Sequence, residues 1–315
     1  MLIMRKPNYF QVSQGVWGMK ITFVNIYMIA NRRGAGKGWV LVDAGLRGTA
    51  KKIIAMAEAL FGPGTKPAAI VLTHGHFDHV GALEDLLEYW DVPVYAHPLE
   101  IPYLTGASSY PPGDPTVGGG LMSLMAWAYP TKPINLGGRV IPIDKYEGIP
   151  QLPEWKVIHT PGHSPGHISL FFPLNTTLIA GDAFVTTRQE SAIYALNFIK
   201  KLSGPPKYFT SDWHSAQKSV QKLAALQPRI AATGHGLVMR GKELQQDLNY
   251  LANHFKELAV PAHGRYVKRA AIADETGVKY IPSYTEDSKI KLKVGAVTAA
   301  AALAAFFITR AVARR

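Results

Sequence analysis

Four side chains that can bind a metal ion lie within residues 74–79 of this chain. His74, His76, Asp78 and His79 form the pattern H-x-H-x-D-H. Neutral histidine is a common ligand of zinc-like ions, and aspartate adds negative charge to such a site. Burying so many polar groups without partners would be costly. Two metal ions held close together would satisfy all four groups, so the pattern predicts a dinuclear metal site.

Three further candidate ligands, His163, Asp182 and His235, each follow a short apolar run. These runs are expected to be buried strands and cover residues 155–158, 177–180 and 229–232. Glycine or proline lies beside each ligand, which places it at a strand end or in a tight turn. Strand ends are rigid, so the three side chains can point into one shared cleft.

Five histidines and two aspartates are enough for two ion sites, each with an open position for water or substrate. A single-metal site is the chemical alternative. Closed structural zinc sites use four ligands and favour cysteine. The chain contains no cysteine, which excludes a zinc finger, a disulfide and a thiol nucleophile.

The elements that must carry these ligands follow from the apolar pattern. A strand is expected at residues 68–72, directly before the H-x-H-x-D-H pattern. Further strands are expected at residues 21–30, 38–43 and 94–96. Helices are expected at residues 51–61, 81–90, 211–226 and 241–259, and in a segment that contains Ile193, Leu196 and Ile199.

Taken in order, these features closely resemble the metallo-β-lactamase superfamily of hydrolases over roughly residues 10–260. The matching elements are the strand and turn at residues 40–45, the H-x-H-x-D-H pattern, and the turns at His163, Asp182 and His235. The resemblance implies an α/β fold, a four-layer αββα sandwich with the metal site at the strand ends.

The resemblance also implies a role for each ligand. One ion would be held by His74, His76 and His163, and the other by Asp78, His79 and His235. Asp182 would bridge the two ions, and Asp43 would orient the histidines without touching metal. The cofactors would be two divalent ions, in the first place zinc, with manganese or iron as alternatives. A water or hydroxide between the ions would be the nucleophile.

Asp78 and Tyr194 are the candidate catalytic residues. Tyr194 follows Asp182 and could polarise a substrate carbonyl, although it could equally be a packing residue of its helix. His167, four residues after His163, is expected to be a structural turn residue, with donation to the site as the alternative.

The substrate is the least determined feature. The T-H-x-H-x-D-H-x-G start is similar to glyoxalase II-like thioesterases, but their glutathione-binding Lys and Tyr correspond to Ser191 and Ile193 here. Acyl-homoserine lactonases resemble the His163 turn, but their tyrosine corresponds to Val185. The resemblance therefore implies hydrolysis of an ester, a lactone or a thioester, without selecting among them.

Two other enzyme classes of the superfamily stay open. A mono-iron persulfide dioxygenase-like enzyme would keep the same first ligands. A phosphodiesterase or nuclease would suit the net charge of +12, but residues 265–315 carry half of that charge and no nucleic-acid motif is evident. A small molecule is therefore the expected partner, and nucleic acid is not.

Residues 103–133 form an insertion rich in glycine and proline, with an apolar stretch that includes Met125 and Trp127. Such insertions are often lids or binding loops. The insertion is predicted either to form an apolar wall that selects an acyl-bearing substrate, or to pack on the core or on a second subunit of a homo-oligomer.

The chain is expected to divide into a hydrolase domain (1–260), a basic extension (261–293) and an apolar tail segment (294–315). The start shows no long apolar secretory segment, which favours a cytoplasmic protein. Residues 294–309 carry no charge and, as a helix, would span about 24 Å. A bilayer core is about 30 Å thick, so interfacial binding to an anionic membrane is the expected role, with packing on the protein or disorder as alternatives.

Overall fold

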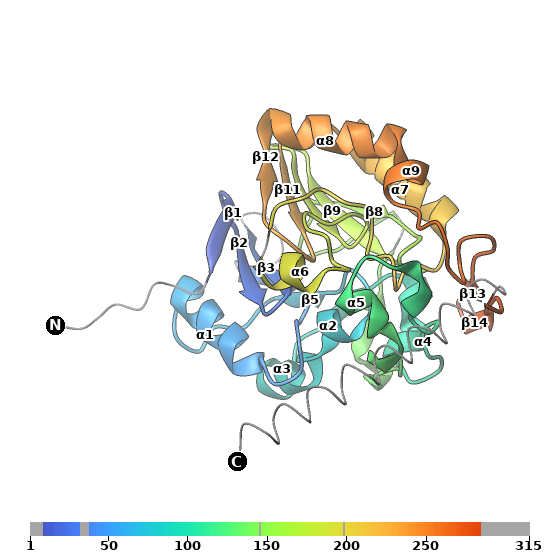
Figure 1. Cartoon of the computed structure of the whole chain (residues 1–315). Helices are drawn as coiled ribbons and strands as arrows, with labels where there is room; N and C mark the ends of the chain where they lie inside the picture. Colours follow the sequence, from blue (N-terminus) through green and yellow to red (C-terminus); the bar gives the residue numbers. More distant parts are fainter. Residues whose placement is uncertain (1–8, 32–37, 145, 198, 285–315) are drawn as a thin grey trace, which may run out of the picture.

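Two β-sheets lie face to face in the computed structural model of the chain, and helices cover the outer face of each sheet (Figure 1). The structure describes residues 9–31, 38–144, 146–197 and 199–284. Within these residues the first sheet has seven strands in chain order: β1 (Phe10–Ser13), β2 (Val16–Ile21), β3 (Val24–Asn31), β4 (Gly38–Val42), β5 (Ala69–Val71), β6 (Val94–Ala96) and β7 (Val140–Pro142). The second sheet has the order β12 (Met239–Arg240), β11 (Ile230–Thr233), β10 (Thr177–Gly181), β9 (Ile168–Phe172) and β8 (Lys156–His159).

Parallel pairing brings the ends of the ligand-bearing strands together. Strands β1 to β4 pair antiparallel, but β4, β5, β6 and β7 pair parallel. In the second sheet, β10 and β11 are also parallel. Parallel neighbours end at the same edge of a sheet. Asp43 and His74, which follow β4 and β5, therefore leave the first sheet at one edge, as Asp182 and His235 leave the second.

Side chains of β4 alternate between two hydrophobic cores, as the period of a strand requires. Trp39 and Leu41 pack toward the outer helices of the first sheet. Val40 and Val42 pack into the core between the sheets, which also contains Ile179 of β10. Both faces of the strand are thus buried, which explains its nearly continuous apolar sequence.

Helices form the two outer layers. Helices α1 (Ala50–Phe61) and α3 (Leu83–Trp90) bury their apolar faces on the first sheet. Helices α7 (Trp213–Ala225) and α8 (Gly241–Asn253) bury theirs on the second sheet. Three hydrophobic cores separated by two sheets confirm the predicted four-layer αββα sandwich.

The predicted elements agree with the observed ones except at some ends. The strand at residues 94–96 is observed as predicted. The helix predicted at residues 241–259 is divided instead, because His254 leaves the helical conformation (φ −117°, ψ 30°) between α8 and α9 (Phe255–Leu258). The helix predicted at residues 81–90 begins two residues later, at Leu83.

The insertion at residues 103–133 is organised into short helical segments. Its short helical turns are η2 (Pro115–Val117), α5 (Leu121–Leu124) and η3 (Ala126–Ala128), and η1 (Pro98–Glu100) and α4 (Ile101–Leu104) lead into it. The N–H of Met122 donates to the carbonyl of Glu190 (3.0 Å), beside α6 (Ala192–Asn197). The insertion therefore lies against the segment that follows Asp182, and Figure 1 shows α5 and α6 at the centre of the molecule.

The remaining elements lie near the end of the described chain or join the layers. These are η4 (Gly137–Arg139) and the hairpin of β13 (Ile272–Asp274) and β14 (Gly277–Tyr280). The Arg265 N–H donates to the Asp114 carboxylate, which ties residues after 260 to the insertion. No helix in the described part of the chain is long and apolar enough to cross a membrane. The predicted tail segment (294–315) lies outside the described residues, and the predicted domain limits stay predictions.

Candidate metal centre

All seven predicted ligands are buried where the edges of the two sheets meet. Their residues are between 0% and 6% exposed, and Asp78 is the most exposed of them. Asp78 and His79 lie on the short helix α2 (Phe77–Val80) rather than in an irregular loop, and His74 and His76 lie between β5 and α2. His163, Asp182 and His235 follow β8, β10 and β11. The fold therefore assembles ligands from segments far apart in sequence.

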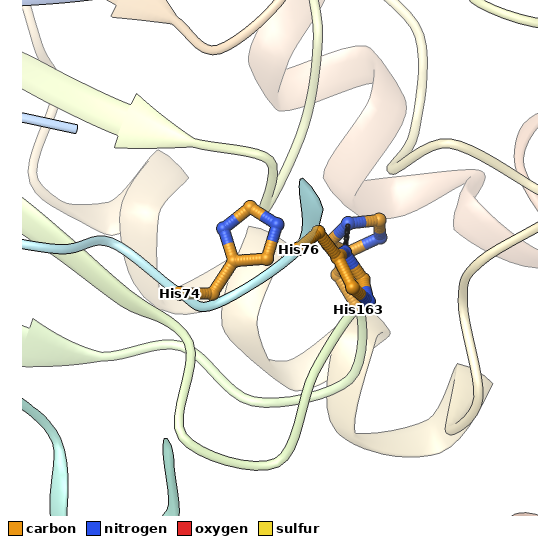
Figure 2. Close-up of side chains that lie close together, drawn as sticks. All are labelled: His74, His76 and His163. Atoms are coloured by element: carbon orange, nitrogen blue, oxygen red, sulfur yellow. Dashed lines mark hydrogen bonds between the residues drawn. The ribbon is translucent and has the colours of Figure 1, made fainter. Parts of the chain in front are cut away.

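The first predicted triplet, His74, His76 and His163, offers ligand atoms that all lie within 4.8 Å of one another. His76 Nδ1 and His163 Nε2 are 3.0 Å apart, as the dashed line in Figure 2 marks. His74 approaches the pair from the other side (Figure 2). Three neighbouring imidazole nitrogens form a suitable set of ligands for a zinc-like ion.

The second predicted triplet, Asp78, His79 and His235, also brings its ligand atoms within 4.8 Å of one another. Asp78 Oδ2 lies 3.5 Å from His235 Nε2. This triplet therefore combines one carboxylate with two imidazoles.

Asp182 lies between the two triplets. Its Oδ2 is 3.0 Å from His235 Nε2, 3.4 Å from His163 Nε2 and 3.7 Å from His79 Nε2. One carboxylate oxygen thus faces ligands of both predicted ion sites, which is the position that a bridging ligand needs. Gly234 makes this approach feasible, because a Cβ on that residue would lie 2.1 Å from Asp182 Oδ1.

Unpartnered buried atoms test whether metal ions fit this site. Within the described part of the chain, His74 Nε2, His79 Nε2 and Asp182 Oδ1 are buried without a hydrogen-bond partner. Buried polar atoms are normally satisfied. They are three of eleven such atoms in this part of the chain, and they alone among the eleven belong to predicted ligands. Two divalent ions would satisfy all three. The donor set of nitrogen and carboxylate oxygen fits such ions.

Hydrogen bonds behind His74, His79 and His235 direct their Nε2 lone pairs toward the centre. His79 Nδ1 donates to Asp43 Oδ2 (2.8 Å), and His235 Nδ1 donates to the Phe23 carbonyl (2.7 Å). Thr73 Oγ1 donates to Asp43 Oδ2 (2.8 Å) and can then accept from His74 Nδ1 (3.0 Å). Such outer partners fix the tautomer and orientation of a ligand histidine.

Asp43 occupies the position predicted for it. Its Oδ1 also accepts the Thr73 N–H (2.7 Å), so one carboxylate holds both His79 and the residue before His74. Asp43 has φ of +62°, in the left-handed region that few residues other than glycine adopt. We infer that these contacts offset the cost of that conformation.

His167 lies behind Asp182 and outside the ligand groups. Its Nε2 accepts the Asp182 N–H (2.8 Å), while its Nδ1 pairs with Thr160 Oγ1 (2.8 Å). Burial lowers the pKa of His167 to about 3, which keeps the ring neutral and Nε2 free to accept. Its contacts therefore agree with a structural role in the turn.

The two triplets differ in their protonation. Burial lowers the pKa of His74 and His163 well below the usual value and that of His76 to about 3. Burial alone would do the same for His79 and His235, but the carboxylates of Asp43, Asp182 and Asp78 raise their pKa values. The first triplet is thus neutral, which is the state that a ligand histidine requires.

An aromatic cluster that the sequence did not reveal lies beside the centre. The ring of Phe209 stacks on His76, with centroids 4.8 Å apart. Phe209 packs with Ala126 and Tyr208, and Phe77, Val117, Met122 and Tyr129 complete the cluster. The insertion contributes Val117, Met122, Ala126 and Tyr129 to this cluster but neither Met125 nor Trp127, and Trp127 is 65% exposed. Whether the insertion selects an acyl-bearing substrate stays a prediction. No local pattern singles out Phe209, because its neighbours come from distant segments.

Tyr194, the other candidate catalytic residue, lies half-buried on α6. The Arg188 guanidinium lies 5.5 Å from the centre of the Tyr194 ring. The backbone carbonyl of Tyr194 accepts a hydrogen bond from the Thr187 hydroxyl (3.0 Å). A role of its hydroxyl at a substrate carbonyl stays a prediction.

Comparison with known proteins agrees with this geometry. The family described as "Metallo-beta-lactamase superfamily" matches residues 20–235. The chain is 43% identical over 249 residues to "Probable metallo-hydrolase YflN" of Bacillus subtilis (strain 168), covering 79% of this chain and 94% of the relative. It is 28% identical over 215 residues to "Probable metallo-hydrolase YybB" of the same organism, covering 68% and 82%.

A solved structure shows the same fold. It is the metallo-beta-lactamase family protein TTHA1429 from Thermus thermophilus, with a TM-score of 0.52, 20% identity, and coverage of 78% of this chain and 81% of that one. The match to the family spans all seven ligand positions, from His74 to His235. With its dinuclear-type site of histidines and aspartates, this chain belongs to the metallo-beta-lactamase superfamily.

Proposed function

We propose that this metallo-hydrolase cleaves an ester, a lactone or a thioester by attack of water on the carbonyl carbon. The observation that carries the proposal is the position of Asp182 between two complete ligand triplets that contain unpartnered buried atoms. Two divalent ions bound here would lower the pKa of a water to about 7 and would polarise the substrate carbonyl.

The ligands proposed for the two ions come from both sheets. His74, His76 and His163 would hold one ion, Asp78, His79 and His235 would hold the other, and Asp182 would contact both. Zinc is the proposed native metal, because imidazole nitrogen predominates among the ligands.

Side chains around the centre indicate an apolar part in the substrate. Tyr129, Phe77 and Phe209 exclude water on one side of His76. Phe23 covers another ligand, with its ring stacked on His235 at 6.1 Å. These contacts support a small-molecule substrate that bears an apolar acyl group.

Exposed apolar side chains also lie on the two short helices α5 and α6. Leu121 of α5 and Ile193 and Leu196 of α6 are 57%, 67% and 49% exposed. The N–H of Met122 holds α5 beside α6 through the Glu190 carbonyl (3.0 Å). A long acyl chain bound along these two helices would bury side chains that otherwise contact water, which is favourable.

Proton release by the zinc-loaded protein tests the proposal. A short ester, a long-chain acyl lactone and a glutathione thioester would be supplied in parallel, with a phosphodiester as the contrasting substrate. Turnover of at least one carbonyl substrate, with none of the phosphodiester, is expected. The chelator-treated protein should be inactive and should recover when zinc is returned.

Two results would contradict the proposal. Cleavage of the phosphodiester alone would indicate a phosphodiesterase. Oxygen consumption with a persulfide by the iron-loaded protein, and inactivity of the zinc-loaded protein on all three carbonyl substrates, would indicate a dioxygenase.

A further inference from the structure

Four hydrogen-bond donors converge on the carboxylate of Glu100, which is fully buried at the end of η1. Oε2 accepts the Gly75 N–H (3.0 Å) and the Tyr110 hydroxyl. Oε1 accepts the Ser164 hydroxyl (2.7 Å) and the Gly166 N–H (2.7 Å). An ionised carboxylate offers acceptors alone, so it suits a position surrounded by donors.

These donors come from the two segments that carry the first triplet of ligands. Gly75 lies between His74 and His76, and Ser164 directly follows His163. Each oxygen of Glu100 therefore holds one segment, and the side chain joins the two across 91 residues of sequence. The ligand atoms on the two segments, His76 Nδ1 and His163 Nε2, are 3.0 Å apart.

Packing around Glu100 leaves little room for the segments to shift. A Cβ on Gly166 would lie 2.8 Å from Glu100 Cγ, so the His163 segment lies directly against this side chain. On the other side, the ring of Tyr110 lies 4.5 Å from the ring of His76 and stacks on Tyr103 at 3.9 Å. The hydroxyl of Tyr110 also accepts the Gly75 N–H (2.9 Å).

We propose that Glu100 is a positioning residue that sets the distance between His76 and His163, and thereby the affinity of the first triplet for its ion. The proposal rests on the metal centre of the proposed function, although it makes no assumption about the substrate. Glu100 acts on the backbone beside the ligands, whereas Asp43 bonds a ligand ring directly. The second triplet should therefore be insensitive to a change at Glu100.

The test is the affinity of the full-length, metal-free chain for Co²⁺, followed by the visible absorption of the bound ion. Glu100→Gln keeps the shape of the side chain but places an amide N–H₂ against one pair of donors. Asp78→Ala removes a ligand of the second triplet alone, so this variant should bind a single ion at the first triplet. Adding Glu100→Gln to Asp78→Ala should lower the affinity for that ion about 10- to 100-fold and change its absorption.

Glu190→Gln is the matched control. Glu190 is also a buried glutamate that accepts a backbone N–H, from Lys207 at 2.9 Å, but it contacts neither ligand segment. Its Co²⁺ affinity and spectrum should equal those of the wild type. Tyr110→Phe removes one donor to Glu100 and keeps the ring, so it should weaken the first site less than Glu100→Gln, and it serves as the second variant should Glu100→Gln fail to fold.

Two results would overturn the proposal. In the Asp78→Ala background, Glu100→Gln could leave the Co²⁺ affinity and spectrum unchanged. In the wild-type background, it could weaken both ions equally, which would indicate a general effect on the fold. Because Co²⁺ binding requires no substrate, failure of every carbonyl substrate would refute the proposed function and leave this inference standing.

Discussion

The two predicted ion sites of this centre are supported in different ways. The triplet of His74, His76 and His163 contains nitrogen donors alone, and its histidines are kept neutral by burial. The triplet of Asp78, His79 and His235 includes a carboxylate, and carboxylates raise the pKa of its histidines. Behind the second triplet, Asp43 bonds the His79 ring itself.

This difference shows that a buried carboxylate can support a metal ligand by two routes. Asp43 orients a ring through its Nδ1–H, whereas Glu100 bonds the peptide groups next to ligands. The first route controls the direction of one lone pair. Under our proposal, the second controls the distance between two backbone segments. Substitutions can separate the two routes, because each should affect one ion site.

Asp182→Ala should have the largest effect, because this carboxylate faces both sites. Both ions should be bound weakly. If they supply about 4 kcal/mol to the transition state, turnover should fall about 1,000-fold. Metal content by mass spectrometry and kcat on the active carbonyl substrate would be measured together. A variant with two ions and full turnover would disprove the bridging assignment.

Asp78→Ala should divide the sites, because Asp78 belongs to the second triplet alone. We expect one ion per chain and a loss of turnover of about 100-fold, or about 3 kcal/mol. Leu248→Ala, which removes a buried side chain between α8 and the second sheet, is the control for general destabilisation. Loss of both ions in Asp78→Ala, but not in the control, would show that the sites are interdependent.

Asp43→Asn should weaken ion binding at the second triplet, as Glu100→Gln should weaken it at the first. The amide keeps the shape but weakens the contact that orients His79, so affinity for the second ion should fall about 10- to 100-fold. A Co²⁺ titration with His76→Ala in the background would isolate that ion. Equal weakening of the first ion would mean that the Thr73 contacts of Asp43 matter as much as its His79 contact.

Tyr129→Ala should change substrate preference without changing either ion. Tyr129 packs on Phe77 at 5.7 Å and lies in the cluster that covers His76. Losing about 1 kcal/mol of apolar contact should raise KM about fivefold for a long-chain substrate, and less for a short one. Trp127→Ala, at an exposed position of the same insertion, is the control. Equal changes in KM for both chain lengths would exclude Tyr129 from the acyl site.

His97 provides the smallest expected effect, an acid-dependent loss of stability from a pair of rings outside the ligand triplets. Its ring stacks on His159 at 4.0 Å, and burial and His159 lower its pKa to about 4. Because the folded protein favours the neutral ring, stability should fall as the pH drops from about 6.5 toward 4. Solvent around this half-buried pair reduces the cost to about 1 kcal/mol, or about 2–4 °C in Tm.

Tm of the metal-free protein across that pH range would be compared with Tm of His97→Gln. The variant should lose less stability in acid than the wild type. Parallel curves would show that another group causes the acid effect.

The seven candidate ligands could be picked out from the sequence because their signals are local. Each is a histidine or aspartate that lies either in the H-x-H-x-D-H pattern or in a turn directly after an apolar run, and a family resemblance orders them. Glu100 and Phe209 gave no such signal. Their importance depends on contacts across 66 and 133 residues, to Gly166 and His76, which no sequence window contains. Likewise, the apolar content of the insertion was visible, but which of its side chains contact the centre depended on packing against Phe77 and Phe209.

Strand β3 holds the turn that carries the last ligand. Asn25 Nδ2 donates to the carbonyls of Thr233 (2.9 Å) and Gly236 (2.8 Å), and the Tyr27 hydroxyl donates to Thr233 (2.6 Å). The side chains that hold the His235 turn are therefore synthesised long before His235 itself. At about 5–20 residues per second, the interval between residues 79 and 235 lasts roughly 8–30 s. During translation the nascent chain lacks part of the predicted ligand set. Under our proposal, the pair of ions is therefore bound only once the second half of the protein has emerged.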